Sequence, residues 1–285
     1  MSAPEHRVAI VTDSISSLTQ TMGQGFQVQV VPVYVSFGTE SYRDGINLDA
    51  ERFYRLLRDS KKLPTTSQPT VHDFVQLYTE LSHQAEAIVS IHTSRKMSAT
   101  VDSAQAASKE LPDLPIHVID SRSVSMGLGL MAIAAARAAA AGKDAARIAR
   151  LVKDLIPKMN VIFTVETLEY LRKGGRIGGA TALLGFALSI KPVLYMKDGQ
   201  VEPLEKPRTR KRATGRVLDL MADRVGASEA VHAAVLHCAA PDEAQPLADQ
   251  VAERFPCAEL LAVEAGPIIG THAGPGTLGV AFYAE

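Results

Sequence analysis

The chain is poor in cysteine and in aromatic residues: of 285 residues, two are cysteine, none is tryptophan and 5% are aromatic. So few cysteines exclude a disulfide-stabilised scaffold. Cys238 and Cys257 lie in or next to apolar, strand-like segments, so we expect both to be reduced and buried. Residues 1–7 are polar, and the apolar run at 8–12 is too short for a signal peptide. We therefore expect a cytoplasmic protein.

Strong net charge and long apolar runs are also absent. The net charge is -1 and the isoelectric point is about 6.7, so no overall field attracts nucleic acid or an anionic membrane. The longest apolar helical stretch, residues 126–141, contains Arg137 and is too short to span a bilayer. We expect no nucleic-acid partner and no stable membrane insertion.

Motifs for common enzyme chemistry are missing as well. Neither Cys-x-x-Cys nor His-Glu-x-x-His spacing occurs, and the eight histidines are scattered, so a metal site has little support. No Gly-x-Ser-x-Gly turn presents a nucleophilic serine, and no Gly-x-x-x-x-Gly-Lys loop is available for a nucleotide. We expect no metal and no cofactor on this chain.

What the sequence does have is a regular alternation of elements. Short β-branched runs alternate with amphipathic stretches, which predicts an α/β fold with largely parallel sheets. The pattern changes near residue 160, so we predict two α/β domains, residues 1–159 and 160–285. Expected strands are 8–12, 27–37 (broken at Pro32), 87–92, 117–120, 161–165, 191–197, 200–204, 233–237, 260–264 and 279–283. Expected helices are 48–59 (with Asn47 as a candidate N-cap), 70–84, 98–109, 126–141, 145–156, 167–173, 178–188, 208–225 and 242–254.

The most informative stretch lies near the C-terminus, at residues 266–276. His272 is placed there between glycines and prolines, after a short apolar strand. Glycine lets a ligand or a second segment approach closely, and histidine exchanges a proton readily near neutral pH. The stretch indicates either a loop that holds an imidazole against a ligand or a turn with a solvated histidine.

Polar residues directly follow the first predicted strand. Ligands of open α/β sheets bind at the carboxyl ends of the strands, where Asp13 and Ser14 are expected to lie. These two residues therefore form either a polar wall of a site or a helix cap.

Two further loops are rich in hydroxyl groups. Thr66 belongs to residues 64–69, where two prolines fix the backbone. Ser94 and Ser98 belong to residues 92–100, which also contain two cations. Such groups bind carboxylates or phosphates before a helix, although both stretches also fit ordinary helix-starting loops.

Two segments are basic. Residues 171–179 hold Arg176 among glycines and fit an anion clamp, a docking site or a simple helix end. Residues 206–212 lack interleaved aromatics, which favours the start of a helix over a nucleic-acid site. Between them, the apolar residues 180–195 predict a buried core, the lining of a cavity, or both.

Taken together, these segments resemble the DegV family of fatty-acid-binding proteins, in order and spacing over nearly the whole chain. The resemblance rests on Val11-Thr12-Asp13-Ser14, Thr66-Ser67-Gln68-Pro69, the serine-containing loop to Thr100, Gly174-Gly175-Arg176-Ile177, Arg208-Thr209 and His272-x-Gly274-Pro275-Gly276. It implies two α/β domains with one long-chain fatty acid between them. It also implies the lipid-presenting subunit of a bacterial fatty acid kinase, whose ATP-binding partner resembles dihydroxyacetone kinases and phosphorylates the carboxylate.

The resemblance also implies roles for particular residues. Thr66 and Ser98 would hydrogen-bond the carboxylate, and His272 and Arg208 would lie in the polar network around it. Arg176 would lie at the same mouth or at the face that docks the kinase. ATP and its metal would come with the partner, and a monomer suits such a carrier.

One position departs from the family pattern. The serine loop usually reads Leu-Ser-Gly-Thr, and this chain has Met97-Ser98-Ala99-Thr100. The added methyl group of Ala99 puts the backbone of the loop, and the position of its serine, in question. Ser94 is therefore a second candidate, and Asp13 and Ser14 are further candidates for the mouth.

The energetics of a fatty acid fit this interpretation. Each buried methylene gains roughly 0.8 kcal/mol, which favours a closed apolar tunnel. A buried carboxylate is costly unless it is paired, and hydroxyls with an arginine or a histidinium meet that need. We expect His272→Ala or Arg208→Ala to impair acyl-phosphate formation more than folding.

Two other functions remain open at this point. A stand-alone enzyme on a small anionic substrate would use His272 as acid and base, assisted by Asp13 or Ser14. A DNA-binding regulator would use residues 206–212, with salt-sensitive binding. Long-chain acids that co-purify with the protein would favour the carrier over both.

Overall fold

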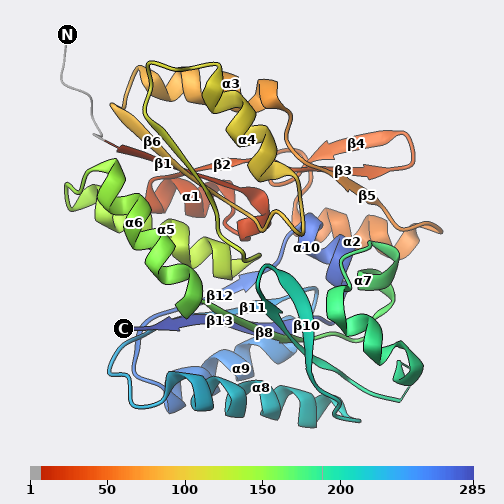
Figure 1. Ribbon diagram of the computed structural model, residues 1–285. Coiled ribbons are helices and arrows are strands. Elements are labelled where there is room, and N and C mark those ends of the chain that lie inside the picture. The colour runs from red at the N-terminus through yellow and green to blue at the C-terminus, as the bar shows by residue number, and fades with distance from the viewer. Residues whose placement is uncertain (1–7, 188) are drawn as a thin grey trace.

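The computed structural model describes residues 8–187 and 189–285. Residues 1–7 and the last residue of the helix expected at 178–188 lie outside the described part. Figure 1 shows a layered α/β arrangement: α3 and α4 lie at the top, then a first sheet, then α5 and α6, then a second sheet, and α8 and α9 at the bottom. The α/β class predicted from the sequence is confirmed.

The first sheet has four parallel strands in the order β2-β1-β6-β7. Its strands are β1 (Val8–Asp13), β2 (Val28–Val31), β6 (Ala87–His92) and β7 (Ile116–Asp120). Helices cover both faces, so β6 is buried along its whole length and reads as a nearly continuous apolar run. The covering helices are α1 (Gln20–Phe26), α3 (Val71–Ser82), α4 (Thr100–Lys109), α5 (Met126–Ala140) and α6 (Ala145–Leu155).

Helix α5 lies between the two sheets and contacts strands of both. It is apolar except for Arg137, whose exposed side chain pairs with Glu259 near the end of the helix, as expected of a helix that is almost wholly buried. Its buried residues join strands of the first and second sheets in one continuous core. This helix therefore holds the two sheets at a fixed separation.

The second sheet has six strands in the order β10-β9-β8-β13-β11-β12. Only β11 and β12 pair in parallel, and the other neighbours are antiparallel, so the expectation of largely parallel sheets is wrong for this half. The cause is the predicted hairpin around Asp198 and Gly199, both at positive φ, and the insertion of β13 between β8 and β11. The elements are β8 (Asn160–Thr164), α7 (Glu169–Lys173), η3 (Gly178–Phe186), β9 (Val193–Lys197), β10 (Gln200–Glu205), α8 (Arg210–Val225), β11 (Val231–His237), α9 (Pro241–Arg254), β12 (Cys257–Glu264) and β13 (Leu278–Ala284).

A third, antiparallel sheet in the order β4-β3-β5 was not expected. The strand predicted at 27–37 is two strands in different sheets, because Pro32 and Val33 turn the chain between β2 and β3. Asp49, and not Asn47, caps α2 by accepting a hydrogen bond from the Arg52 N–H. The additional elements are β3 (Tyr34–Phe37), β4 (Glu40–Arg43), β5 (Thr65–Ser67), α2 (Ala50–Asp59), α10 (Pro267–Ala273) and the short turns η1 (Ser14–Ser16) and η2 (Ile156–Lys158).

The two large sheets are formed by residues on opposite sides of the predicted boundary. The first sheet is built before residue 160 and the second from Asn160 onward, whereas α10 crosses back to pack on α2, β3 and β5. The division into two domains stays a prediction. Both cysteines are free thiols; Cys238 is buried and Cys257 is half-buried.

Candidate functional site

A pocket lies where the two large sheets meet the small one. Its empty space is about 870 Å³ with the solvent at its mouth included, and only a small part of that space admits a water molecule. The pocket is therefore narrow. Its apolar lining consists of Ile15, Val33, Met97, Ala99, Val124, Val161, Phe163, Leu171, Met196, Val201, Leu236, Ile268, Ile269 and Ala273.

The walls come from opposite halves of the chain. Ile15, Thr93 and Val124 follow the carboxyl ends of β1, β6 and β7, where an open α/β sheet holds its ligands. Val161 and Phe163 are two residues apart on β8 and so project to the same side of the second sheet. A molecule in the pocket would contact both sheets.

Four of the predicted site residues gather on this pocket: Thr66, Ser98, Arg176 and His272 all line it. Thr66 Oγ1 and His272 Nε2 share a hydrogen bond of 2.9 Å across 206 residues of sequence. Two elements unforeseen in the sequence hold them, since Thr66 is the central residue of β5 and His272 belongs to α10.

The stretch at 266–276 is a short helix followed by a turn, and its interpretation as a loop is wrong. Pro267 begins α10, where a missing N–H is harmless, and Gly274 at φ 80° follows its end. The Tyr54 hydroxyl donates to the Ala265 carbonyl at 2.9 Å and fixes the chain just before the helix. One face of α10 then lines the pocket with Ile268, Ile269, His272 and Ala273.

His272 carries no charge near neutral pH. Burial, and next the positive charge of Arg176, lower the pKa of its imidazole from 6.5 to about 4. Its Nδ1 is buried without a hydrogen-bond partner and lies so close to Gly174 that a Cβ there would approach within 2.3 Å. The imidazole is therefore a neutral hydrogen-bonding group held tightly against a glycine.

Arg176 supplies the positive charge at this end of the pocket. Its Nε donates to the Met97 carbonyl at 3.2 Å and its Nη1 to the Gly174 carbonyl at 2.6 Å. The side chain is half-buried, and both of these acceptors are neutral. Within residues 8–187 and 189–285, no carboxylate therefore pairs with its charge, and a ligand carboxylate would complete the pairing.

The serine loop accommodates alanine without strain. Ala99 has φ −79° and ψ 16°, angles open to any residue, so the methyl group does not distort the backbone. Ser98 Oγ and Thr100 Oγ1 share a hydrogen bond of 2.9 Å. Ser98 thus lies at the pocket with its hydroxyl oriented by a neighbour.

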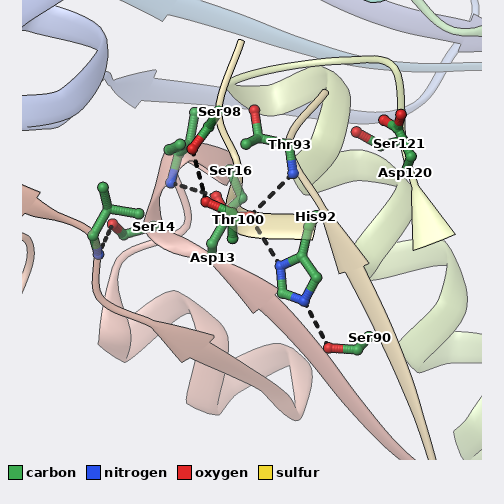
Figure 2. A network of polar contacts seen from close by, with 12 residues as sticks. Asp13, Ser14, Ser16, Ser90, His92, Thr93, Ser98, Thr100, Asp120 and Ser121 are labelled. Atoms are coloured by element: carbon green, nitrogen blue, oxygen red, sulfur yellow. Dashed lines mark hydrogen bonds and ion pairs between the residues drawn. The ribbon is translucent and has the colours of Figure 1, made fainter. Parts of the chain in front are cut away.

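A buried polar network anchors the start of this loop (Figure 2). Asp13 Oδ2 accepts hydrogen bonds from the Thr93 N–H and from His92 Nδ1, both at 3.0 Å. Beyond His92, its Nε2 bonds the Ser90 hydroxyl at 2.7 Å. All of these side chains are buried, and none but Thr93 lines the pocket. Asp13 therefore supports the site from behind and does not form its mouth.

Three other candidates also lie elsewhere. The Ser14 hydroxyl accepts from the Val33 N–H at 3.1 Å. The Ser94 hydroxyl donates to the Gly199 carbonyl at 2.6 Å, which ties the β9–β10 hairpin to the first sheet. Arg208 is exposed and lies beyond the far end of β10 from Val201, a residue of the pocket wall. None of the three lines the pocket.

Several lining residues were not predicted from the sequence. Gln68, Thr93, Ser125 and Thr277 add polar groups to the pocket; the first two lie in the hydroxyl-rich loops, whereas the last two follow no motif. None of the described residues within 180–195 lines it. Ala180 and Leu183 belong to the core, and Phe186 is 51% exposed, under the Lys206 ammonium.

The described residues contain neither a cluster of potential metal ligands nor a helix that could span a membrane. Within residues 8–187 and 189–285, no group of three or more histidine, cysteine or acidic side chains is arranged to hold a metal ion. Over the same residues, no helix has the length and apolar character needed to cross a membrane.

Known proteins resemble this chain over nearly its whole length. A DegV domain-containing protein of Streptomyces coelicolor is 39% identical over 275 residues, which cover 96% of this chain and 97% of that protein. The DegV protein of Bacillus subtilis is 33% identical, with 96% and 98% covered.

Solved structures give the same result. A DegV family protein from Thermus thermophilus, described by its fatty acid binding, superposes with a TM-score of 0.93 at 35% identity and covers 98% of this chain and 100% of its own. DegV of Bacillus subtilis, described as a fatty acid binding protein, superposes with a TM-score of 0.91 at 32% identity, covering 99% and 100%. The model of the DegV family, described as uncharacterised proteins, matches residues 7–285. The chain therefore belongs to the DegV family.

Proposed function

We propose that this protein binds a long-chain fatty acid in the pocket and presents the carboxylate to a separate ATP-dependent kinase. The observation that carries the proposal is the gathering of Thr66, Ser98, Arg176 and His272 on a narrow, otherwise largely apolar pocket. Relatives of the same fold from Thermus thermophilus and Bacillus subtilis are described as binding fatty acids, which supports the same ligand here.

The two ends of a fatty acid need different surroundings, and the pocket offers both. The apolar walls remove the methylene chain from water, at roughly 0.8 kcal/mol per methylene. The carboxylate meets the Arg176 guanidinium and the hydroxyls of Thr66 and Ser98. Neutral His272 orients Thr66 through their shared hydrogen bond. The charge partner is thus the arginine, and not a histidinium.

The phosphoryl step would take place on the partner's nucleotide. A carboxylate oxygen attacks the γ-phosphorus of ATP, the bond to the β-phosphate oxygen breaks, and ADP leaves while an acyl phosphate forms. Such transfer depends mainly on positioning and on neutralising charge. The partner, a kinase subunit similar to dihydroxyacetone kinases, would supply ATP and its metal. This chain would act as a cytoplasmic monomer that holds the acyl group.

The stand-alone enzyme has less support from the site. With a pKa of about 4, His272 is a weak base near neutral pH, far from the value that suits a general base there. Asp13 cannot assist it, because its carboxylate is occupied by the Thr93 and His92 donors.

The first experiment is to denature the purified protein, extract it with organic solvent and identify acyl chains by mass spectrometry. The second adds the kinase subunit, ATP and a long-chain acid to delipidated protein and measures acyl phosphate. Thr66→Val removes the hydroxyl at constant volume, and we expect about tenfold less product. Thr65→Val is the matched control, because Thr65 is the exposed neighbour on β5 and does not line the pocket. Absence of any bound or bindable fatty acid, or equal behaviour of the two variants, would overturn the proposal.

A further inference from the structure

A second cavity adjoins the pocket on the far side of the β9–β10 hairpin. Its empty space is about 1600 Å³ including open solvent, and its lining mixes polar and charged side chains with apolar ones. Those that matter here are Ser123, Asn160, Lys197 and Arg224. The first cavity is narrow and mostly apolar, whereas this one is wider and has a larger share of polar groups, so the two would treat a hydrocarbon chain differently.

Residues that follow one another in the chain line different cavities. Ser123 lines the second cavity and Val124 the first; likewise, Asn160 lines the second and Val161 the first. Met196 is the one described residue that lines both. Its side chain is only 9% exposed and belongs to the core between the sheets. The wall at this point is therefore the methionine side chain itself.

The backbone explains why the wall is thin here. The ladder between β8 and β9 ends at the pair Ile162 and Tyr195, so beyond that pair no β-ladder closes the sheet. Met196 is still held from its other side, because it pairs with Val201 on β10. Beyond the last pair of the β8–β9 ladder, Asn160 of β8 and Lys197 of β9 line the second cavity.

The polar cluster and the apolar wall around Met196 belong to different elements. Thr66 and His272 come from the small sheet and α10, and Ser98 from the loop after β6. A chain whose carboxylate is held there would also contact the second sheet, whose Val161, Phe163 and Met196 line the same pocket.

We propose that Met196 is the end wall of the acyl pocket and sets the upper limit of acyl-chain length. The proposal rests on the fatty-acid function proposed above. Chains that end before Met196 gain affinity with each methylene, whereas a longer chain must displace the side chain and enter the more polar second cavity. Methionine suits this position because its unbranched thioether adapts to fill irregular space.

The test measures the affinity of delipidated protein for a series of saturated fatty acids. Below the limit, each added methylene should tighten binding by about fourfold; above it, the affinity should stop rising or fall. Met196→Ala removes the wall and should move the break to longer chains by about two or more carbons, with at least about tenfold tighter binding of the acid just above the wild-type limit. Met196→Phe should move the break to shorter chains.

Met221→Ala is the matched control. Met221 is fully buried, but it lies in the core on the far face of the second sheet and lines neither cavity. Its length profile should equal that of the wild type. If the wild type binds acids but Met196→Ala and Met196→Phe keep its break, Met196 is not the end wall. If the wild type binds no acid of any length, the proposed function itself fails.

Discussion

Two histidines of this protein have opposite surroundings. His92 is fully buried, both ring nitrogens are hydrogen-bonded, and its ring packs edge-on against Phe74 with centroids 5.0 Å apart. His272 has one nitrogen bonded to Thr66, and the other is buried without a partner. A complete network specifies structure, whereas an incomplete one beside a cavity leaves capacity for a ligand. The residues next to each histidine in the sequence do not show which of the two is structural and which faces a ligand site.

The largest effect we expect is on stability, from His92→Ala. The change leaves a cavity against Phe74 and removes partners from Asp13 and Ser90, so it should cost about 3–5 kcal/mol. His272→Ala, by contrast, should cost about 1–2 kcal/mol but lower fatty-acid affinity. Urea unfolding measures both; equal losses of stability would contradict the distinction.

The next effect compares two arginines, both implicated by the family resemblance. Arg176→Gln removes the charge from the pocket and should weaken fatty-acid binding by about 10- to 100-fold. Arg208→Gln should change it less than about twofold, because this exposed side chain does not line the pocket. The measurement is displacement of a fluorescent fatty acid. If only Arg208→Gln lost fatty-acid affinity, Arg208 and not Arg176 would be the arginine near the carboxylate, as the family resemblance implies.

The smallest effect concerns the pH dependence of stability. Because the pKa of folded His272 is about 4, below its usual 6.5, the unfolded chain takes up this proton first as the pH falls. Neutral His272 therefore contributes fully to the free energy of unfolding above about pH 6.5. As the pH falls from about 6.5 to 4, this contribution is lost, by up to about 1.4 kcal/mol per pH unit. His272→Gln should remove this loss, so the stability difference between wild type and variant should shrink by about 2 kcal/mol from pH 6.5 to 5.

Other titrating groups are shared by both proteins and cancel in this comparison. The free energy of unfolding, obtained from urea titrations at each pH, gives the result. A constant difference across this range would mean that the imidazole is solvated when folded. The incomplete surroundings of His272 would then have no energetic consequence.

The first sheet and helices α3 to α6 were readable from the sequence because their signals are strong and local, whereas the small sheet of the same half was not. The run at 87–92 is buried along its whole length, and the alanine-rich run from Met126 is buried except toward its end, so their composition alone reports their position. The order of the second sheet was not readable, since pairing of β13 between β8 and β11 depends on contacts far apart in the chain.

Four residues of the candidate site were predicted from the sequence, but the short helix and strand that carry two of them were not. Helix α10 has only seven residues, and glycines flank it on both sides. Its stability therefore comes from packing on α2 and β3 rather than from helix propensity. Strand β5 has three residues, too few for a periodic pattern. Arg208 and Arg176 both lie in basic motifs, and only the path of β10 shows that one of them lies away from the pocket.

The pocket has walls from both large sheets, so a bound ligand affects how stably the two halves of the protein hold together. An occupant contributes to the cohesion of the two halves, because it replaces contacts that the sheets do not make with each other. Ligand at a hundred times its dissociation constant adds about 2.7 kcal/mol to the native state. The ligand-free and the ligand-bound protein therefore differ in thermal stability. A preparation with mixed occupancy would unfold over a broad range of temperature.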